Sequence, residues 1–485
     1  MASIRKNFGY NLALTLCNYL FPLVTYPYVS RVLGVERIGI CNFVDGIVNY
    51  FILFCALGIA SYGIRELAKC REDYDKRNYV FSNLIALNSI TTIIALVALV
   101  SATLWIPSLQ SYREFLWLGV LKLVCNMFLI EWFFQGIQEF KYITIRSVIV
   151  KLLFIACLFI FVHTKEDVII YYGLTVGSKV LSAIINWSYS TKYRKLSFRH
   201  LNLRLFVAPI LAFGYYRILT SMYTTFNIVF LGFSSGDVEV GYFTTATKLY
   251  GILLSVFTAF TTVMVPKVSE LLASGEKERL QIIANKTFSV LSIVALPIII
   301  VSLFCTEDII LLLSGPGYEG AYTPFRIVIF MLLIIGIEQI IIQQFLMASQ
   351  SNISIVKISS IGAVVGITLN SLITPTFGAI GSAISWSLSE LVVMFTGIYL
   401  VKKMLGIYLN GQMLVTNMLW SLLYVVPLSL VKYFDFGIWM NLILSGIVFV
   451  FLFLLINLKF NKNEVVEETV ARFIPKLNRI IKFNK

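Results

Sequence analysis

Residues 437–458 read GIWMNLILSGIVFVFLFLLINL and contain no charged side chain. A helix of this length extends about 33 Å, enough to cross the roughly 30 Å hydrocarbon core of a bilayer. Similar apolar stretches recur along the 485-residue chain, of which 58% is hydrophobic and only 13% charged. Water-soluble proteins carry roughly a quarter charged residues. The sequence therefore predicts an all-α integral membrane protein.

Apolar windows bounded by charges, Gly and Pro predict about fourteen transmembrane helices. They are residues 10–30, 38–62, 82–106, 113–134, 143–162, 168–190, 205–232, 240–265, 285–313, 325–347, 353–375, 378–401, 411–432 and 437–458. If the N-terminus is cytoplasmic, the segments on that side carry 28 Lys and Arg residues and those on the other side carry 6. Positive residues are enriched in cytoplasmic loops. Both termini are therefore expected in the cytoplasm, and the net charge of +14 needs no nucleic-acid partner.

Short sequence matches indicate an internal repeat. Leu33-Gly34 and Gly39, before the second span, are echoed by Leu231-Gly232 and Gly241, before the eighth, at offsets of 198 and 202 residues. Six spans separate the copies, so both halves would have the same membrane orientation. We expect two pseudo-symmetric six-helix lobes, 1–200 and 201–404. An appended helix pair at 405–460 and a basic amphipathic cytoplasmic tail at 461–485 would follow.

Polar side chains recur every three or four residues in the first two spans of each predicted lobe, which places them on one helical face. The candidates for a substrate cavity are Asn11, Thr15, Asn18, Asn42, Asp45, Asn49, Arg217, Ser221, Thr244, Lys248 and Ser255. Amides and hydroxyls can equally join helices through hydrogen bonds. Charges at mid-membrane depth are costly and persist mainly where water or a partner receives them. Arg217, Lys248 and Asp45 therefore favour a cavity.

A second group of charged residues lies inside other predicted spans. Lys122, Lys179, Glu338 and Glu390 are candidates for coupling to Na⁺ or H⁺, or for structural ion pairs. Lys151 and Glu131 lie nearer span ends, where a long side chain can reach the interface. The excess of basic groups in the predicted cavity indicates an anionic ligand, because Arg and Lys bind phosphate oxygens through charge-assisted hydrogen bonds.

Catalytic and metal-binding motifs are missing from the sequence. There is no G-x-x-x-x-G-K-[ST] phosphate-binding loop, and the seven cysteines are scattered singly. Only two histidines are present, so we expect no metal site. These features predict a transporter and not an enzyme.

Four stretches carry a family resemblance. They are Ser30-Arg31-Val32-Leu33-Gly34, Glu131-Trp132-Phe133-Phe134-Gln135-Gly136, Gly315-Pro316-Gly317-Tyr318 and Phe377-Gly378-Ala379-Ile380-Gly381-Ser382-Ala383. In this order they resemble the Wzx-type polysaccharide flippases of the multidrug/oligosaccharidyl-lipid/polysaccharide exporter superfamily, over essentially the whole chain.

The resemblance implies a cationic cavity between two lobes and transport by alternating access. The implied cargo is an undecaprenyl-pyrophosphate-linked oligosaccharide for O-antigen, capsule or exopolysaccharide, moved to the outer leaflet of a bacterial inner membrane. Other polysaccharide assembly proteins are candidate partners. One alternative is a multidrug or cation antiporter on the same fold, which would favour an acidic, aromatic cavity. A membrane glycan polymerase or ligase is a second alternative, and it would favour a large external domain.

Overall fold

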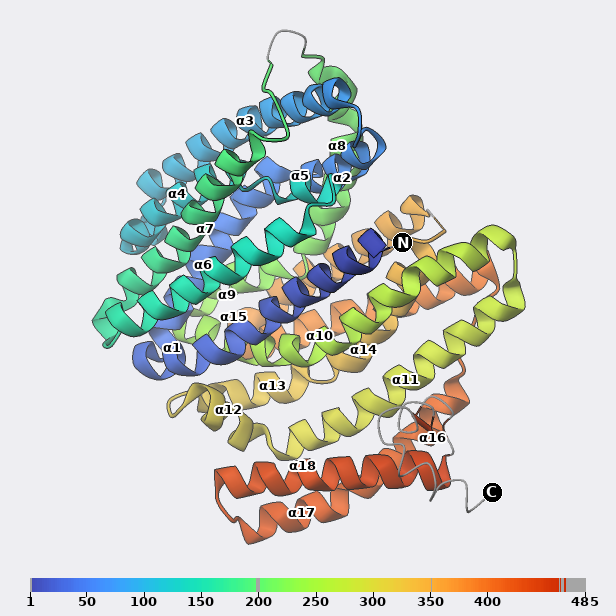
Figure 1. Cartoon of the computed structure of the whole chain (residues 1–485). Coiled ribbons are helices and arrows are strands. Elements are labelled where there is room, and N and C mark those ends of the chain that lie inside the picture. Colours follow the sequence, from blue (N-terminus) through green and yellow to red (C-terminus); the bar gives the residue numbers. More distant parts are fainter. Residues whose placement is uncertain (1, 198–200, 350, 462, 464–465, 468–485) are drawn as a thin grey trace. The chain divides into compact units, whose positions relative to one another are not determined.

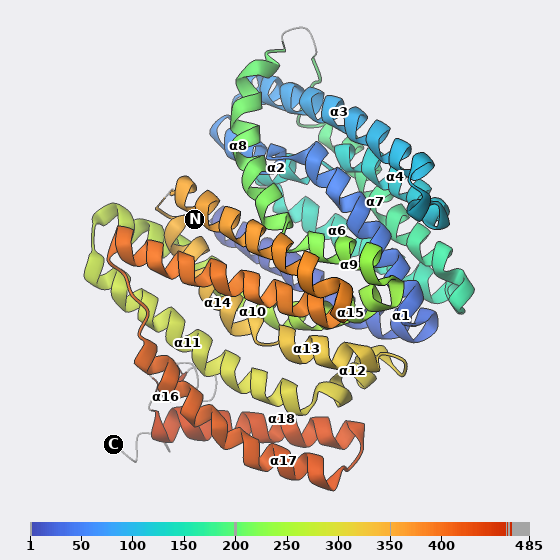
Figure 2. The same ribbon diagram turned by 180° about the vertical axis from the view of Figure 1, so that it is seen from behind.

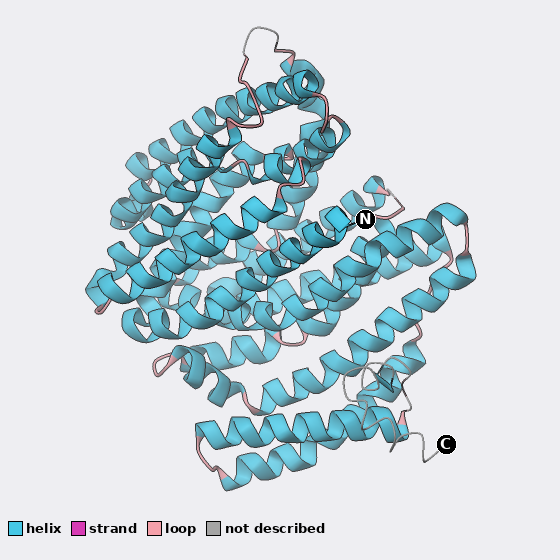
Figure 3. Ribbon diagram, viewed as in Figure 1, coloured by secondary structure: helices cyan, strands magenta, loops and turns pink. Residues whose placement is uncertain are grey.

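Helices make up nearly all of the computed structural model, which describes residues 2–197, 201–349, 351–461, 463 and 466–467. Figure 3 shows only helices and loops within these residues. Eleven helices of this described part are long and apolar enough to cross a bilayer. The all-α membrane fold is thereby confirmed, whereas the count of fourteen spans stays a prediction. The tail predicted at 461–485 lies almost entirely outside the described residues.

The chain forms two compact units. The first comprises Met1–Thr245, Ser314–Gly320 and Ser359–Ser389. Its helices are α1 (Ala2–Ala56), α2 (Ile59–Lys69), α3 (Tyr74–Trp105), α4 (Arg113–Leu129), α5 (Glu131–Gly136), α6 (Phe140–Phe161), α7 (Val168–Ser190), α8 (Leu203–Ser221) and α9 (Thr225–Ser235), with the start of α10 (Asp237–Ser274) and the middle of α15 (Asn352–Leu405). In Figure 1, α4 lies beside α7, and α1 packs against α3, α4 and α6.

The second unit comprises Ala246–Leu313, Ala321–Ile358 and Glu390–Lys485. It contains the remainder of α10 and both ends of α15, together with α11 (Lys277–Phe304), most of α12 (Thr306–Ser314), α13 (Tyr322–Val328), α14 (Met331–Gln339), α16 (Gly411–Ser421), α17 (Val425–Phe434) and α18 (Ile438–Leu455). In Figures 1 and 2, α17 and α18 form an antiparallel hairpin. These units do not follow the predicted lobes 1–200 and 201–404, whose boundaries stay predictions.

Exposed apolar side chains cover the outer faces of the long helices. Ile94 on α3 is 64% exposed, and Ile447 on α18 is 59% exposed. In water such surfaces would drive aggregation, whereas lipid tails solvate them. Their backbone groups are paired within the helices, as the bilayer core requires.

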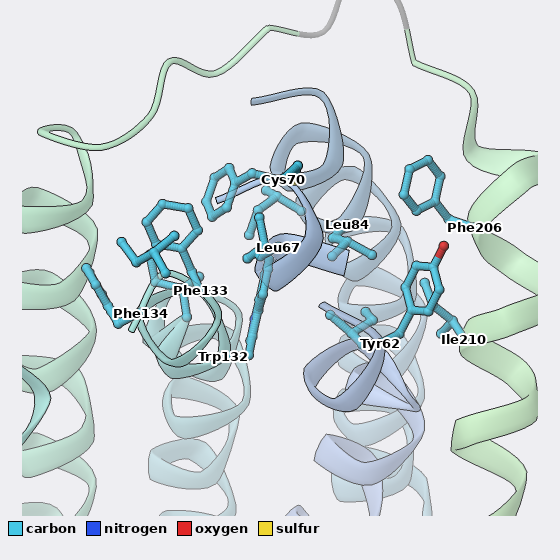
Figure 4. Packing of buried hydrophobic residues seen from close by; sticks show 14 of the residues in the cluster. Tyr62, Leu67, Cys70, Leu84, Trp132, Phe133, Phe134, Phe206 and Ile210 are labelled. Carbon is cyan, nitrogen blue, oxygen red and sulfur yellow. The ribbon is translucent and has the colours of Figure 1, made fainter. Parts of the chain in front are cut away.

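An aromatic core fills one end of the first unit, where α2, α3, α5 and α8 meet (Figure 4). Trp132, Phe133 and Phe134 of α5 are buried there beside Phe81 of α3. Gly63 on α2 makes this packing possible, because a Cβ atom at that position would lie 2.6 Å from the Trp132 ring. The sequence Glu131–Gly136 thus packs into the core through its aromatic residues.

Two glycines interrupt the helices in the same way. Gly34 breaks α1 with φ 78° and ψ 171°, and Gly236 separates α9 from α10 with φ 88° and ψ 179°. Residues other than glycine rarely adopt this backbone conformation. The two positions are 202 residues apart in the sequence. In the structure the equivalent of Gly34 is therefore Gly236, four residues after the Gly232 that the sequence match indicated. Gly232 itself lies inside α9 against Phe43.

Several predicted spans are interrupted in the structure. The span predicted at 113–134 is broken at Ile130, and the span predicted at 205–232 is broken at 222–224. The span at 325–347 consists of α13, α14 and a π-helix at Ile340–Leu346. Continuous apolar sequence does not reveal such breaks, because they arise where helices must bend around their neighbours.

Candidate functional site

A pocket of about 380 Å³ lies inside the first unit, between α1, α2, α3, α4, α5 and α8. Its polar lining consists of Asn49, Asn88, Asn126, Glu131, Gln135 and Arg217. Its apolar lining includes Ile52, Leu53, Ile59 and Trp132. Four amides, one carboxylate and one guanidinium therefore surround a space within helices that cross the membrane. We call it the amide pocket.

A sharp break in the chain brings Glu131 to the amide pocket. Ile130 has a left-handed backbone with φ 34°, so α4 ends and α5 starts in a new direction. The side-chain amide of Asn186 on α7 donates to the Leu129 carbonyl, and the Tyr142 hydroxyl donates to the Asn186 carbonyl oxygen over 3.0 Å. Glu131 and Gln135, four residues apart on α5, then lie on the same helical face and line the pocket.

Arg217 supplies the uncompensated positive charge of the amide pocket. The Glu131 carboxylate already accepts a hydrogen bond from Arg146, with Nη2 and Oε1 2.6 Å apart. Arg217 is exposed and forms no hydrogen bond or ion pair with any residue that the structure describes. A free guanidinium is suited to bidentate binding of a phosphate. The surrounding amides can both donate to and accept from sugar hydroxyls.

Asp45 is neutralised by a lysine from another helix. Its Oδ1 atom lies 2.5 Å from the ammonium nitrogen of Lys122, whose side chain is only 10% exposed. Lys122 also donates to Asn49 over 3.0 Å, and the Tyr172 hydroxyl donates to Asp45 over 3.3 Å. The sequence left open whether Lys122 takes part in ion coupling or in a structural ion pair. This geometry is that of a structural ion pair that joins α1 to α4. Asn49 belongs both to this network and to the amide pocket.

Other cavity candidates on α1 bind neighbouring helices. Asn42 donates from Nδ2 to the Thr244 hydroxyl over 3.0 Å. Lys151 does not extend alone to the interface, because its ammonium group donates to Asn18 over 2.5 Å and lies over the Phe21 ring. The side chains of Asn11 and Thr15 lie outside the described part of the chain.

The span that carries the candidates Arg217 and Ser221 does not continue as one helix. The break at 222–224 separates Arg217 from Asn227, which is fully buried and binds Asn370. Ser221 is buried, and its hydroxyl donates to the Ile218 carbonyl, so it caps the end of α8. The Asn227–Asn370 contact joins α9 to α15, the alternative that the sequence left open, whereas the Ser221 hydroxyl bonds within α8.

The remaining candidates lie elsewhere. Lys248 and Ser255 are on the part of α10 that belongs to the second unit, where Ser255 donates to its own helix. Lys179 is exposed on α7. Glu338 on α14 and Glu390 on α15 both lie in the second unit, and Glu390 is only 4% exposed. Lys179 and Lys248 are not among the residues that line the amide pocket, and their predicted roles stay predictions.

Sequence reasoning missed part of the amide pocket. Asn88, Glu131 and Gln135 were not among the cavity candidates, although they line it. The sequence placed Glu131 near the end of the predicted span 113–134, where a long side chain can reach the interface. The sequence did contain a signal for this pair. Glu131 and Gln135 are the two polar residues of the otherwise aromatic and small segment Glu131–Gly136, and their spacing of four places them on one face of a helix.

Comparisons with known proteins agree with this architecture. A family model described as polysaccharide biosynthesis protein matches residues 4–272, more than half of the chain. The chain belongs to this family. It is a Wzx-type member of the multidrug/oligosaccharidyl-lipid/polysaccharide superfamily, and a MatE family model matches residues 214–372. The family consists of transporters and not of enzymes.

Individual relatives span the same length. The family member named "Putative O-antigen transporter" from Escherichia coli K12 is 27% identical over 395 residues, 81% of this chain and 95% of that protein. The capsular polysaccharide biosynthesis protein CapF of Staphylococcus aureus is 24% identical over 412 residues, 82% of this chain and 99% of that protein.

Two solved structures share the fold. Lipid II flippase MurJ in an inward closed conformation has a TM-score of 0.77 at 13% identity, over 93% of this chain and 99% of that one. An inward-facing multidrug resistance MATE transporter has a TM-score of 0.68 at 14% identity, over 82% and 98%. Likeness at this identity establishes the fold, and the family establishes the flippase class.

Proposed function

We propose that this flippase moves an undecaprenyl-pyrophosphate-linked oligosaccharide from the cytoplasmic to the outer leaflet of a bacterial inner membrane. The oligosaccharide would be a repeat unit of O-antigen, capsule or exopolysaccharide, as in the relatives' names. The termini would lie in the cytoplasm, as the distribution of Lys and Arg predicts. Other proteins of polysaccharide assembly would receive the flipped unit.

The observation that carries this proposal is the free guanidinium of Arg217 among the amides of Asn49, Asn88 and Asn126. Arg146 already satisfies Glu131, so the pocket favours an anion. A pyrophosphate supplies that anion, and sugar hydroxyls match the amides. The polyprenyl tail would stay in lipid, because hydrocarbon gains nothing from a polar pocket.

Alternating access would carry the headgroup across the bilayer. The two lobes would rock so that the binding residues face first one side and then the other. Net transport needs an energy source, and inward Na⁺ or H⁺ is our proposal. Glu338 and Glu390 are the candidates for that coupling, because carboxyl groups inside the membrane-spanning helices α14 and α15 can bind H⁺ or Na⁺.

The test replaces Arg217 in a strain that depends on this chain for surface polysaccharide. Arg217→Ala should reduce surface glycan at least tenfold, because a charge-assisted bond to phosphate contributes about 1.5–3 kcal/mol. Arg217→Lys should retain part of the activity. Arg204→Ala is the matched control, since Arg204 is an exposed arginine on the same helix that does not line the amide pocket. Lys248→Ala tests the second basic residue predicted from the sequence.

Membrane extracts distinguish transport from other defects. Loss of flipping should leave single lipid-linked repeat units in the cytoplasmic leaflet, whereas loss of a polymerase would change glycan chain length. Normal surface glycan in Arg217→Ala cells with normal protein levels would contradict the proposal. Increased drug sensitivity with unchanged glycan would support the antiporter alternative instead.

A further inference from the structure

A second hollow, separate from the amide pocket, lies between α6 and α7 in the first unit. It has a volume of about 380 Å³ and is lined by Glu139, Lys141, Tyr142, Ile145, Arg146, Ile149, Ile185 and Tyr189. The hollow starts at the first turn of α6. It therefore lies where a membrane-spanning helix begins, close to the boundary between hydrocarbon and headgroups. We call it the α6–α7 groove.

One end of the α6–α7 groove is cationic and contains an unsatisfied donor. Arg146 is only 7% exposed, and its Nη2 atom binds Glu131. Its Nε atom is buried and has no hydrogen-bond partner within the described residues. An unpaired buried N–H destabilises a protein, so an acceptor that reaches this atom from the groove would remove the deficit. Lys141, which is exposed, adds a second positive charge.

The acidic member of the groove does not cancel this charge. No ion pair joins Glu139 to Lys141 or Arg146 among the described residues. Arg146 is paired with Glu131, so Lys141 carries the positive charge of the groove that no ion pair compensates in the described part of the chain. Arg146 thus binds a carboxylate of the amide pocket and also lines the groove.

The other end of the groove is apolar and faces outward. Ile145 and Ile149 lie one turn apart on α6 and are 46% and 57% exposed. Between them and the charged end, the rings of Tyr142 and Tyr189 stack in parallel with centroids 3.8 Å apart. Tyrosines of this kind are typical of the membrane interface. The groove thus passes from positive charge through aromatic rings to aliphatic side chains.

We propose that the α6–α7 groove binds an anionic phospholipid of the surrounding bilayer. The phosphate accepts hydrogen bonds from Arg146 and Lys141, and one acyl chain lies along Ile145, Ile149 and Ile185. The groove is charged at one end and aliphatic at the other, as a phospholipid has a charged headgroup and an aliphatic acyl chain. A soluble phosphate would leave the aliphatic end without a partner. This inference goes beyond the proposed transport and does not depend on it.

The experiment measures lipid binding to the purified full-length protein by native mass spectrometry. Phosphatidylglycerol, phosphatidylcholine and inorganic phosphate are titrated separately. Phosphatidylglycerol should bind at least about fivefold more tightly than phosphatidylcholine, and Lys141→Ala should remove about that factor, as expected for one lysine near an anionic lipid. Lys195→Ala, which removes an exposed lysine outside the groove, should leave binding unchanged.

Arg146→Lys isolates the orphan donor, because it keeps the positive charge beside Glu131 but removes the Nε–H group. It should weaken phosphatidylglycerol binding by a similar factor without lowering the melting temperature. If this variant does not fold, Lys141→Ala alone decides. Equal binding of the two lipids, equal effects of Lys141→Ala and Lys195→Ala, or displacement of lipid by millimolar inorganic phosphate would each overturn the proposal.

Discussion

The side-chain amide of Asn42 donates a hydrogen bond to the hydroxyl of Thr244 over 3.0 Å, and the two residues are 202 positions apart. The same offset relates the residues around them. A Cβ atom at Gly39 would lie 1.8 Å from the Asp237 carbonyl oxygen, and one at Gly241 would lie 2.3 Å from the Val35 carbonyl oxygen. These contacts are reciprocal, as at an interface with two-fold symmetry. Asn42 and Thr244 therefore lie at the local pseudo-axis.

The first prediction concerns this close approach. Gly241→Ala should destabilise the protein by about 1–3 kcal/mol, because the new methyl group would overlap a backbone carbonyl that cannot rotate away. Gly251→Ala is the matched control on the same helix, since no atom lies within 4 Å of its Cβ position. That control should be neutral or slightly stabilising. Thermal melting of the purified proteins measures the difference, and equal melting temperatures would contradict the symmetric contact.

The second prediction concerns the two helix breaks. Gly34→Ala and Gly236→Ala should each lower stability by about 1–3 kcal/mol, because both positions adopt a conformation that alanine disfavours. Neither Cβ atom would meet a neighbour closer than 3.7 Å, so the effect isolates backbone strain. Gly177→Ala on α7, where nothing lies within 4 Å, serves as the control. Melting curves should show similar losses for the two break positions and none for the control.

The third prediction concerns the Asp45–Lys122 pair. Asp45→Asn should destabilise the first unit by about 3 kcal/mol, because it leaves a lysine that is nine-tenths buried without its carboxylate. Combining it with Lys122→Met should recover part of that loss, since neither charge then remains. A double-mutant cycle on melting data gives the coupling. Strictly additive losses would show that the two side chains do not stabilise one another.

The fourth prediction concerns pH. Glu307 on α12 accepts hydrogen bonds from Lys432 and Arg326, each over 3.0 Å. The bond from Lys432, more than any other contact, lowers the pKa of Glu307 below its usual range. Its contribution is therefore complete above the unfolded pKa of about 4.3 and is lost as the pH falls through the lower folded value.

The size of this pH effect should be small. All three side chains are more than 40% exposed, and exposed pairs contribute at most about 1 kcal/mol. Glu307→Gln should lower the melting temperature at pH 7 by a few degrees or less. The difference from the wild type should shrink as the pH falls through the lowered pKa of Glu307, because the protonated carboxyl group and the Gln amide are then both uncharged. A difference that grows on acidification would contradict the assigned direction.

Some features of the site followed from local sequence. A charge in hydrocarbon is unfavourable, so the sequence predicted that Arg217 and Asp45 each contact either water or a partner. The structure shows one residue in each of these two situations. Asp45 has its partner in Lys122, and Arg217 lines a pocket. Their different outcomes were not predictable, because the distance between Asp45 and Lys122 depends on how α1 packs against α4.

The amide pocket also contains a residue whose place the sequence did not predict. Glu131 lies near the end of the predicted span 113–134, a position from which its side chain could reach the interface. The left-handed backbone of Ile130 redirects the chain there, and Asn186 from α7 binds the carbonyl group that the break exposes. The deciding contact comes from a helix more than fifty residues further along the chain.

Composition and hydrophobic run length alone determined that this chain is an α-helical membrane protein, because the hydrophobic effect and backbone hydrogen bonding act on each segment wherever it lies. Short motifs indicated its flippase family. Only the tertiary structure decided which charges are paired, where spans break and which amides share a pocket. Those features depend on distances between segments far apart in sequence, and side-chain packing sets these distances only after the helices have assembled.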